Sequence, residues 1–332
     1  MIDIRMWGKA LTGIPRLDRE GWERLDPIAR WLVATRAAVF IMTATSCGIG
    51  GLLALRDGLL DGPRLVACMI GLVFAHATNN LINDLTDHRK GVDRDNYYRT
   101  MYGPQPLEHG LLSERQMFKW IAATGAIALA AGAYLVAETG MVTLTLLGIG
   151  AFFVLFYTWP LKYIGLGEPA VIAVWGPLMI GGTYYVVSGG HWSPEVALIS
   201  LAYAIGPTTV LFGKHTDKLE QDRAKGIRTL PVLLGESLSR RVTVVLWISQ
   251  LALTGLLVAR GSLGWPLLAT FLAVPTLRKV AAVFARPRPQ ERPEEFPASA
   301  WPLYLSAHAF VYNRRFGLLF LGALLVDVLL RR

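Results

Sequence analysis

Residues 65–93 read LVACMIGLVFAHATNNLINDLTDHRKGVD, and this segment joins a long apolar run to a charged one. The first part, Leu65–Asn83, has 19 residues and contains no Asp, Glu, Lys or Arg. A membrane-spanning helix needs about 20 mostly apolar residues. The ten residues that follow hold three aspartates, a histidine, an arginine and a lysine. The pattern predicts a transmembrane helix that ends in a charged segment at one membrane surface.

The rest of the chain repeats the apolar half of this pattern. Of its 332 residues, 53% are hydrophobic and 17% are charged, whereas roughly 25% are charged in a typical soluble protein. Seven further stretches also lack Asp, Glu, Lys and Arg: Ala37–Leu55, Trp120–Ala137, Thr139–Leu161, Pro169–Pro194, Val196–Gly213, Val242–Ala259 and Gly261–Leu277. These lengths predict an all-α integral membrane protein.

The C-terminal region allows two interpretations. Ala298–Asn313 and Phe316–Val326 are both apolar, but Arg314 and Arg315 separate them. Either one long tilted helix or an interfacial helix followed by a short span fits this pattern. We therefore predict a bundle of about nine transmembrane helices, with eight as the alternative.

The distribution of charge indicates how the bundle is oriented. The chain has 33 Lys and Arg against 24 Asp and Glu, a net charge of +9. With nine spans, 27 of the basic residues fall on the side of the N terminus and five on the other. Cytoplasmic loops carry such an excess, so the positive charge records orientation and gives no support to a nucleic-acid partner. We expect a multi-pass protein of the cell membrane (plasma or inner), with the N terminus and the charged loops cytoplasmic.

The remaining features bound the domain organisation. Residues 1–30 have mixed charge and no apolar signal-peptide core, so we expect a cytosolic or interfacial segment ahead of one transmembrane domain over residues 31–332. Cys47 and Cys68 both lie in apolar stretches, which favours buried thiols over a disulfide or a cysteine metal site.

Polar ligands gather where the second span ends. If the helix continues past Asn83, then Asn83 and Asp87 share a face, and Asp84 lies close to it. Several oxygen ligands on one face suit Mg²⁺, which binds well when one or two carboxylates are joined by phosphate oxygens of a substrate. The segment therefore predicts a site for a metal and a phosphorylated ligand.

A second charged loop follows the sixth span. Residues 214–229 read KHTDKLEQDRAKGIRT and mix acids, which could hold metal, with basic groups, which could hold phosphate. Two such clusters at matching helix ends predict one shared site. The alternative for each loop is a solvated surface that only determines topology.

These residues resemble the motifs of the UbiA superfamily of intramembrane prenyltransferases. The first family motif is Asn-Asp-x-x-Asp followed by a further Asp, here residues 83–87 and then Asp93. The Lys90-Gly91 pair before Asp93 resembles the menaquinone branch, the 1,4-dihydroxy-2-naphthoate polyprenyltransferases. Residues 157–168 (YTWPLKYIGLGE) resemble the family's tyrosine- and lysine-bearing loop, and residues 222–230 (DRAKGIRTL) resemble its second motif. The resemblance implies a helical bundle around a central cavity, with motif loops on the cytoplasmic side.

The second motif departs from the family pattern. The family has Asp-x-x-x-Asp, but Lys218 stands four residues before Asp222. The nearby acids are Asp217 and Glu220, and a regular helix would turn Asp217 about 140° away from Asp222. Either the helix ends near Asp217, or metal binding uses Glu220 with Asp222.

The resemblance implies Mg²⁺-dependent transfer of a polyprenyl group from its diphosphate to an aromatic or other lipophilic acceptor, such as a dihydroxynaphthoate-like quinone precursor. The implied metal ligands are Asn83, Asp84 and Asp87 for one ion, and Asp222 with Glu220 or Asp217 for the other. The implied diphosphate-binding groups are Lys162, Arg89, Lys90 and Arg228. Tyr157 would stabilise the allyl cation or orient the acceptor. Arg36, placed within the first span, would touch the acceptor or the diphosphate, or else extend to the interface.

Two other functions stay open on the sequence. A membrane terpene cyclase on the same scaffold would ionise the same diphosphate, and the chain's own double bond would then attack. A membrane transporter is the second alternative, although transporter sites favour the membrane midplane and these acids lie at helix ends. The expected partners are a polyprenyl diphosphate, a lipophilic acceptor and membrane lipids.

Overall fold

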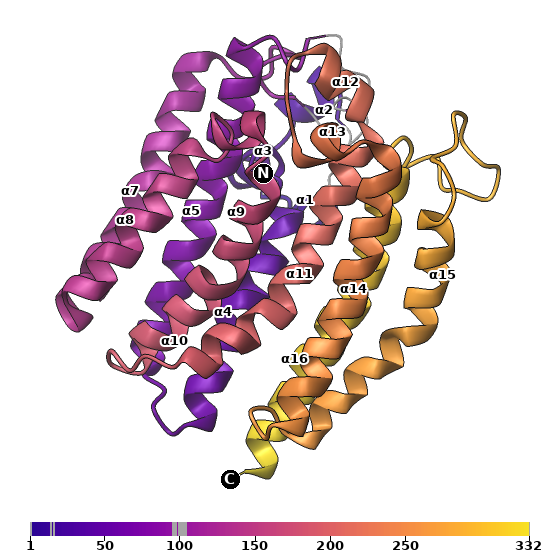
Figure 1. Cartoon of the computed structure of the whole chain (residues 1–332). Coiled ribbons are helices and arrows are strands. Elements are labelled where there is room, and N and C mark those ends of the chain that lie inside the picture. The colour runs from indigo at the N-terminus through magenta and orange to yellow at the C-terminus, as the bar shows by residue number, and fades with distance from the viewer. Residues whose placement is uncertain (1, 14, 16, 95–97, 99–104, 332) are drawn as a thin grey trace.

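The computed structural model describes residues 2–13, 15, 17–94, 98 and 105–331, and the regular elements assigned in these ranges are helices. Seven helical segments of this part are long and apolar enough to cross a membrane: η1–α4 (Ala37–Arg56), α5 (Gly62–Arg89), α7 (Glu114–Thr139), α9–η3–α10 (Gly167–Val187), α11 (Pro194–Asp217), α14 (Glu236–Ala259) and η4–α15 (Trp265–Phe284). Figure 1 shows them running side by side. The predicted all-α membrane bundle is confirmed.

Two more helices run alongside these seven in the described ranges. α8 (Met141–Phe156) is apolar but has 16 residues, which is about 24 Å of helix. α16 is one continuous helix, Tyr304–Leu330, so the single-helix alternative holds for the C-terminal region. Arg314 and Arg315 are both exposed, so they do not belong to the packed surface of this helix. The expectation of about nine helices agrees with this arrangement.

Local sequence signals set the helix ends. The Asp61 carboxylate accepts a hydrogen bond from the backbone N–H of Arg64 and so caps α5. Ser113 and Gln116 form a reciprocal capping box at the start of α7. Gly140 has φ of 81°, a backbone conformation that favours glycine, and it lets α7 turn directly into α8.

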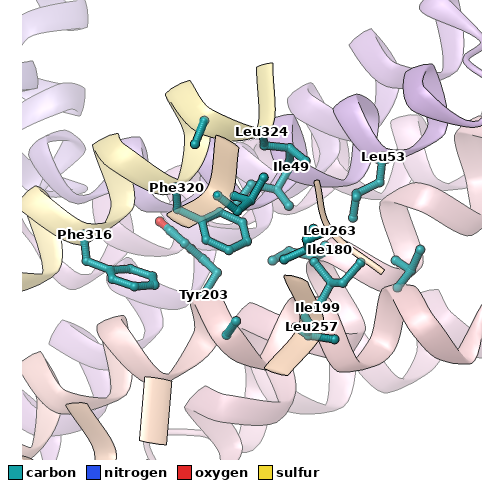
Figure 2. Packing of buried hydrophobic residues seen from close by; sticks show 14 of the residues in the cluster. Ile49, Leu53, Ile180, Ile199, Tyr203, Leu257, Leu263, Phe316, Phe320 and Leu324 are labelled. Carbon is teal, nitrogen blue, oxygen red and sulfur yellow. The ribbon is translucent and has the colours of Figure 1, made fainter. Parts of the chain in front are cut away.

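The main core lies between α4, η3 (Val174–Gly181), α11, α14 and α16, as Figure 2 shows. Its labelled members are Ile49, Leu53, Ile180, Ile199, Tyr203, Leu257, Leu263, Phe316, Phe320 and Leu324. Helices in lipid associate through close packing, because the surrounding lipid is as apolar as these side chains. Gly213 allows one such contact, since a Cβ atom there would lie 2.9 Å from the backbone of Leu305 and Ser306. This contact brings the first turn of α16 against the last turn of α11.

The N-terminal helices cover one end of the bundle. α1 (Ile4–Thr12), α2 (Arg19–Glu23) and α3 (Pro27–Ala34) contribute to a second apolar cluster, in which Trp22 and Leu25 join Leu81 of α5 and Met117 of α7. The short helices η2 (Leu161–Ile164), α12 (Leu219–Ala224) and α13 (Leu230–Leu234) follow α8 and α11. We call the end where α5 and α11 terminate the motif end. In Figure 1 it carries α12 and α13, opposite the C terminus.

Candidate active site

The first motif lies on the last two turns of α5. The i, i+4 spacing of Asn83 and Asp87 puts them on one face of this helix, and both line a cavity inside the bundle. The Nδ2 group of Asn83 donates a hydrogen bond to Thr158 Oγ1 at 3.0 Å, and this bond orients the amide oxygen as a possible ligand. Asp84 is buried and turns toward Arg36. The two aspartates of this motif therefore face different neighbours.

Arg36 lies in a break between two helices, whereas the sequence predicted that it lies within the first span. It follows α3, precedes η1 (Ala37–Val39) and has φ of 55°, in the left-handed region. Such a backbone persists in a non-glycine residue only when its surroundings hold it. Here the guanidinium donates to the Asp84 carboxylate and to the backbone carbonyl of Asn80. Arg36 also lines the cavity, so it does not extend away to the interface.

The loop between α8 and α9 brings Lys162 to the first motif. Lys162 Nζ donates to both oxygens of Asp87, at 2.8 and 3.0 Å, and both side chains are more than nine-tenths buried. Tyr157, at the start of the same loop, lines the cavity with Lys162. A buried carboxylate is tolerated when a cation neutralises it. The pair therefore holds a fixed positive charge beside the acid that the sequence assigned to metal.

Tyr163, the neighbour of Lys162, belongs to this charged region but received no role from the sequence. Its hydroxyl is buried and has no hydrogen-bond partner among the described residues. Burial raises the pKa of Tyr163, and the negative charge of Asp87 raises it further. The charges of Lys218, Asp222 and Asp93 also act on this pKa, so the loop and both motifs lie close together. Asp93 itself is buried.

The second motif begins with a helix break. α11 ends at Asp217, Lys218 is the residue between the helices, and α12 starts at Leu219. The first of the two alternatives, that the helix ends near Asp217, is therefore the observed one. Lys218 Nζ lies 2.9 Å from Asp222 Oδ1, and both side chains are more than nine-tenths buried. Lys218 lines the cavity, with Asp222 paired to it.

Asp217 points away from Asp222 and ties three segments together. Its two oxygens accept hydrogen bonds from the backbone N–H groups of Leu305 and Ser306, each at 2.9 Å. Arg288 Nε donates to Oδ1 at 3.1 Å, and its guanidinium lies 4.8 Å from the centre of the Trp301 ring. Asp217 thus caps the first turn of α16 and anchors the segment before it. Both carboxylate oxygens of Asp217, which the sequence offered as a metal ligand, are thus engaged by groups of the protein.

The other predicted site residues lie toward the surface of the motif end. Glu220 is exposed and accepts hydrogen bonds from Arg223. Arg89 is exposed, pairs with Glu114 and stacks on Phe118. The structure therefore places Glu220 and Arg89 outside the cavity lining.

Two more basic candidates are also exposed. Lys90 Nζ lies 4.8 Å from the centre of the Trp159 ring and 5.5 Å from that of Tyr163. Arg228 donates its backbone N–H to the Tyr163 carbonyl at 3.3 Å. Of the four basic groups that the sequence assigned to diphosphate, Lys162 is thus the one in the cavity lining.

A buried His215–Glu168 pair at this end was not predicted. His215 Nδ1 lies 2.6 Å from Glu168 Oε1, and Glu168 Oε2 accepts the backbone N–H of Leu230 at 3.4 Å. Both side chains are almost fully buried, and His215 lines the cavity. The two residues are 47 positions apart, so only the fold brings them together. The pair joins α9 to α11, and the Leu230 hydrogen bond joins α9 to the start of α13.

The cavity joins a charged head to a long apolar body. Its volume is about 1220 Å³, and its lining on α5 runs from Cys68 to Asp87, about 28 Å of helix. The basic lining residues are Arg36, Lys162, Lys214 and Lys218, and the acidic ones are Asp87 and Glu295. Most of the remaining wall is apolar, with side chains such as Leu72, Leu129, Leu146, Phe153 and Leu178. This shape suits a long apolar molecule with an anionic head.

The two motifs differ in how well they fit a metal ion. Asn83 and Asp87 share a cavity-facing side of α5 and could hold Mg²⁺ together with phosphate oxygens. Asp222 has Lys218 as its nearest charged partner, while Asp217 and Glu220 are engaged elsewhere. Across the described ranges, no three His, Cys, Asp or Glu side chains converge on a point where an ion could sit. Both motifs thus hold a buried lysine–aspartate pair, and they differ in the number of oxygen ligands. The first motif offers two cavity-lining ligands to an ion that a substrate would complete, and the second offers the one carboxylate of Asp222.

Known proteins share sequence similarity with most of this chain. The UbiA prenyltransferase family matches residues 41–313. The 1,4-dihydroxy-2-naphthoate octaprenyltransferase of Escherichia coli (strain K12) is 27% identical over 80% of this chain and 87% of its own. The human UbiA prenyltransferase domain-containing protein 1 is 28% identical over 68% of this chain. That match covers 66% of the human protein, just under two thirds of its length.

Solved structures share the fold. The apo structure of a UbiA homolog from Aeropyrum pernix K1 has a TM-score of 0.66 at 20% identity, covering 87% of this chain and 98% of that one. A UbiA homolog from Archaeoglobus fulgidus bound to GPP and Mg²⁺ has a TM-score of 0.52 at 14% identity, covering 86% and 98%. At these identities the likeness concerns the arrangement of the helices.

Proposed function

The chain belongs to the UbiA prenyltransferase family, and on that premise we propose that it transfers a prenyl group from a prenyl diphosphate to a lipophilic aromatic acceptor. The observation that carries the proposal is the cavity, whose basic head and long apolar body match an amphipathic diphosphate. The A. fulgidus homolog bound to GPP and Mg²⁺ supports the substrate class and the metal. The name of the E. coli relative supports a dihydroxynaphthoate-like acceptor.

The diphosphate binds at the motif end in this proposal. Lys162 and Arg36 line the head of the cavity and attract the phosphate oxygens, while their partners Asp87 and Asp84 fix their positions. Asn83 and Asp87 would hold Mg²⁺, which supplies charge neutralisation to the leaving diphosphate.

The apolar body of the cavity controls the fate of the prenyl group. When the C–O bond to diphosphate breaks, the electron pair leaves with the diphosphate and an allyl cation remains. The apolar walls exclude water, which would otherwise capture the cation. Tyr157 lines the cavity near Lys162 and can stabilise the cation through its ring or orient the acceptor. A nucleophilic carbon of the acceptor then forms the new bond and loses its proton.

Location follows from the charge pattern. We place the protein across the cell membrane with the motif end in the cytoplasm, because the nine-span assignment of the sequence puts 27 of the 33 basic residues on the side of the N terminus. In this orientation the diphosphate of the substrate reaches the site from the cytoplasm, and its prenyl tail lies within the bundle.

The activity is tested with an isosteric change in the first motif. Purified protein in nanodiscs, given Mg²⁺ and radiolabelled prenyl diphosphates of ten to fifty carbons, should release diphosphate in the presence of acceptor. Asp87→Asn should reduce release by a factor of about 100 or more, as for loss of a preorganised electrostatic group. Glu220→Gln, on an exposed side chain of the second motif, is the matched control. Full activity in Asp87→Asn, or no release with any chain length, would overturn the proposal.

A further inference from the structure

Lys218 is the residue that the family pattern does not explain, and the structure places it at the head of the cavity. Its ammonium group lies 2.9 Å from Asp222 Oδ1, and the Lys218 side chain lines the cavity with Lys162 and Arg36. The backbone N–H of Asp222 donates to the Lys218 carbonyl at 2.9 Å, so the two residues are held one turn apart. This turn fixes the ammonium group where a carboxylate of the family motif would stand.

The surroundings of Lys218 disfavour a divalent ion there. Asp222 is 2% exposed, and its second oxygen, Oδ2, has no hydrogen-bond partner among the described residues. A buried carboxylate needs a cation, and the nearest one is the ammonium of Lys218. A divalent ion would find one carboxylate here, whereas at the first motif Asn83 and Asp87 offer two ligands on the cavity side of α5. The other two acids of the motif are engaged with Arg288 and Arg223.

We propose that Lys218 supplies, as a fixed positive charge on the diphosphate, what a second metal ion would supply. The protein then binds its prenyl diphosphate with one Mg²⁺, held at the first motif by Asn83 and Asp87. Lys218 Nζ keeps its ion pair with Asp222 and donates a hydrogen bond to a phosphate oxygen, since an ammonium group has three donors. This inference rests on the proposed function and specifies the charge balance of its substrate site.

The number of bound ions tests the inference without catalysis. The probe is geranyl S-thiolodiphosphate, which is not cleaved, with Mn²⁺ in place of Mg²⁺ and the full chain in nanodiscs. We expect calorimetry to give one Mn²⁺ per chain, and electron paramagnetic resonance to show an isolated Mn²⁺ spectrum. Lys218→Asp restores two carboxylates four residues apart and should bind two Mn²⁺ with spin–spin broadening. Two bound ions in the wild-type protein would overturn the inference even if the variant does not fold.

A second pair of variants measures the contribution of the ammonium group. Lys218→Met should weaken thiolodiphosphate binding by about 10- to 100-fold, the range for a hydrogen bond to a charged group. Arg223→Met removes the same charge from an exposed position of the adjoining helix and should leave binding within about twofold. Unchanged affinity in Lys218→Met would contradict the proposal. Failure of the wild-type protein to bind the probe would instead refute the proposed function itself.

Discussion

Replacing Asp217 by asparagine should destabilise the protein and leave its metal affinity unchanged. The Asp217 side chain is fully buried, accepts two backbone hydrogen bonds from the first turn of α16 and pairs with Arg288. Asparagine has almost the same shape but offers one acceptor oxygen and no charge. Removing one partner of a buried ion pair costs about 3–5 kcal/mol, because the other charge stays buried. We expect Asp217→Asn to lower the free energy of unfolding by an amount in that range.

The assay is reversible unfolding in mixed detergent micelles, followed by tryptophan fluorescence, with Mn²⁺ binding measured on the same samples. A double-mutant cycle with Arg288→Met should show a coupling of about 0.5–3 kcal/mol, as expected for residues in one ion-pair network. Glu220→Gln, on the exposed neighbouring acid, should change stability by less than about 0.5 kcal/mol. If Asp217→Asn abolished Mn²⁺ binding at unchanged stability, Asp217 would be a metal ligand and our assignment would be wrong.

Three further substitutions test, in turn, the charged end of the cavity, its apolar part and the packing of the N-terminal helices. Lys162→Met should abolish measurable thiolodiphosphate binding. It should also lower the free energy of unfolding by about 3–5 kcal/mol, because it leaves Asp87 buried without its cation. Unaltered binding would exclude Lys162 from the substrate site. Gly150 lines the cavity, and a Cβ atom added there would meet no other atom within 4 Å. Gly150→Phe should therefore slow the transfer of long prenyl chains by about tenfold or more and leave the transfer of ten-carbon chains unchanged. Equal slowing of both would contradict binding of the prenyl tail in this part of the cavity. Burial of Asp26 raises its pKa, but hydrogen bonds from Ala29, Asp3, Trp7 and Ile28 outweigh burial and lower it. The stability that Asp26 contributes is therefore present above pH 3.8 and falls as pH drops through the lowered folded pKa. The protection factors of the α1 amides, which are corrected for intrinsic exchange, should fall below pH 3.8, and in Asp26→Asn they should be low already at about pH 7.

Local pattern in the sequence was enough to predict much of the fold. Runs of about 20 apolar residues located the spanning helices. The i, i+4 spacing of Asn83 and Asp87 predicted that they share a face of one helix, and in the structure both line the cavity. These features follow from hydrophobic length and helix periodicity. The continuity of α16 could not be settled in this way. Two adjacent arginines break an apolar run whether they lie on the exposed or the packed surface of a helix.

The partners of the site residues depend on contacts that sequence spacing does not encode. Arg36 pairs with Asp84 across 48 positions, and Lys162 pairs with Asp87 across 75. A basic residue near an acidic motif is equally compatible with a substrate contact and a surface pair. Arg89 pairs with Glu114 at the surface, although it is only two residues from Asp87. The same limit applies to Asp217, whose role depends on a turn of α16 that lies 88 positions away.

The most direct test of the central claim is the mass of the product formed from one prenyl diphosphate and a panel of aromatic acceptors. Purified wild-type protein with Mg²⁺, geranylgeranyl diphosphate and a dihydroxynaphthoate should yield a prenylated aromatic product together with diphosphate. Asp87→Asn should yield neither. A cyclised hydrocarbon or alcohol, formed equally with and without acceptor, would show that the cavity directs the cation to its own double bonds, and would contradict prenyl transfer.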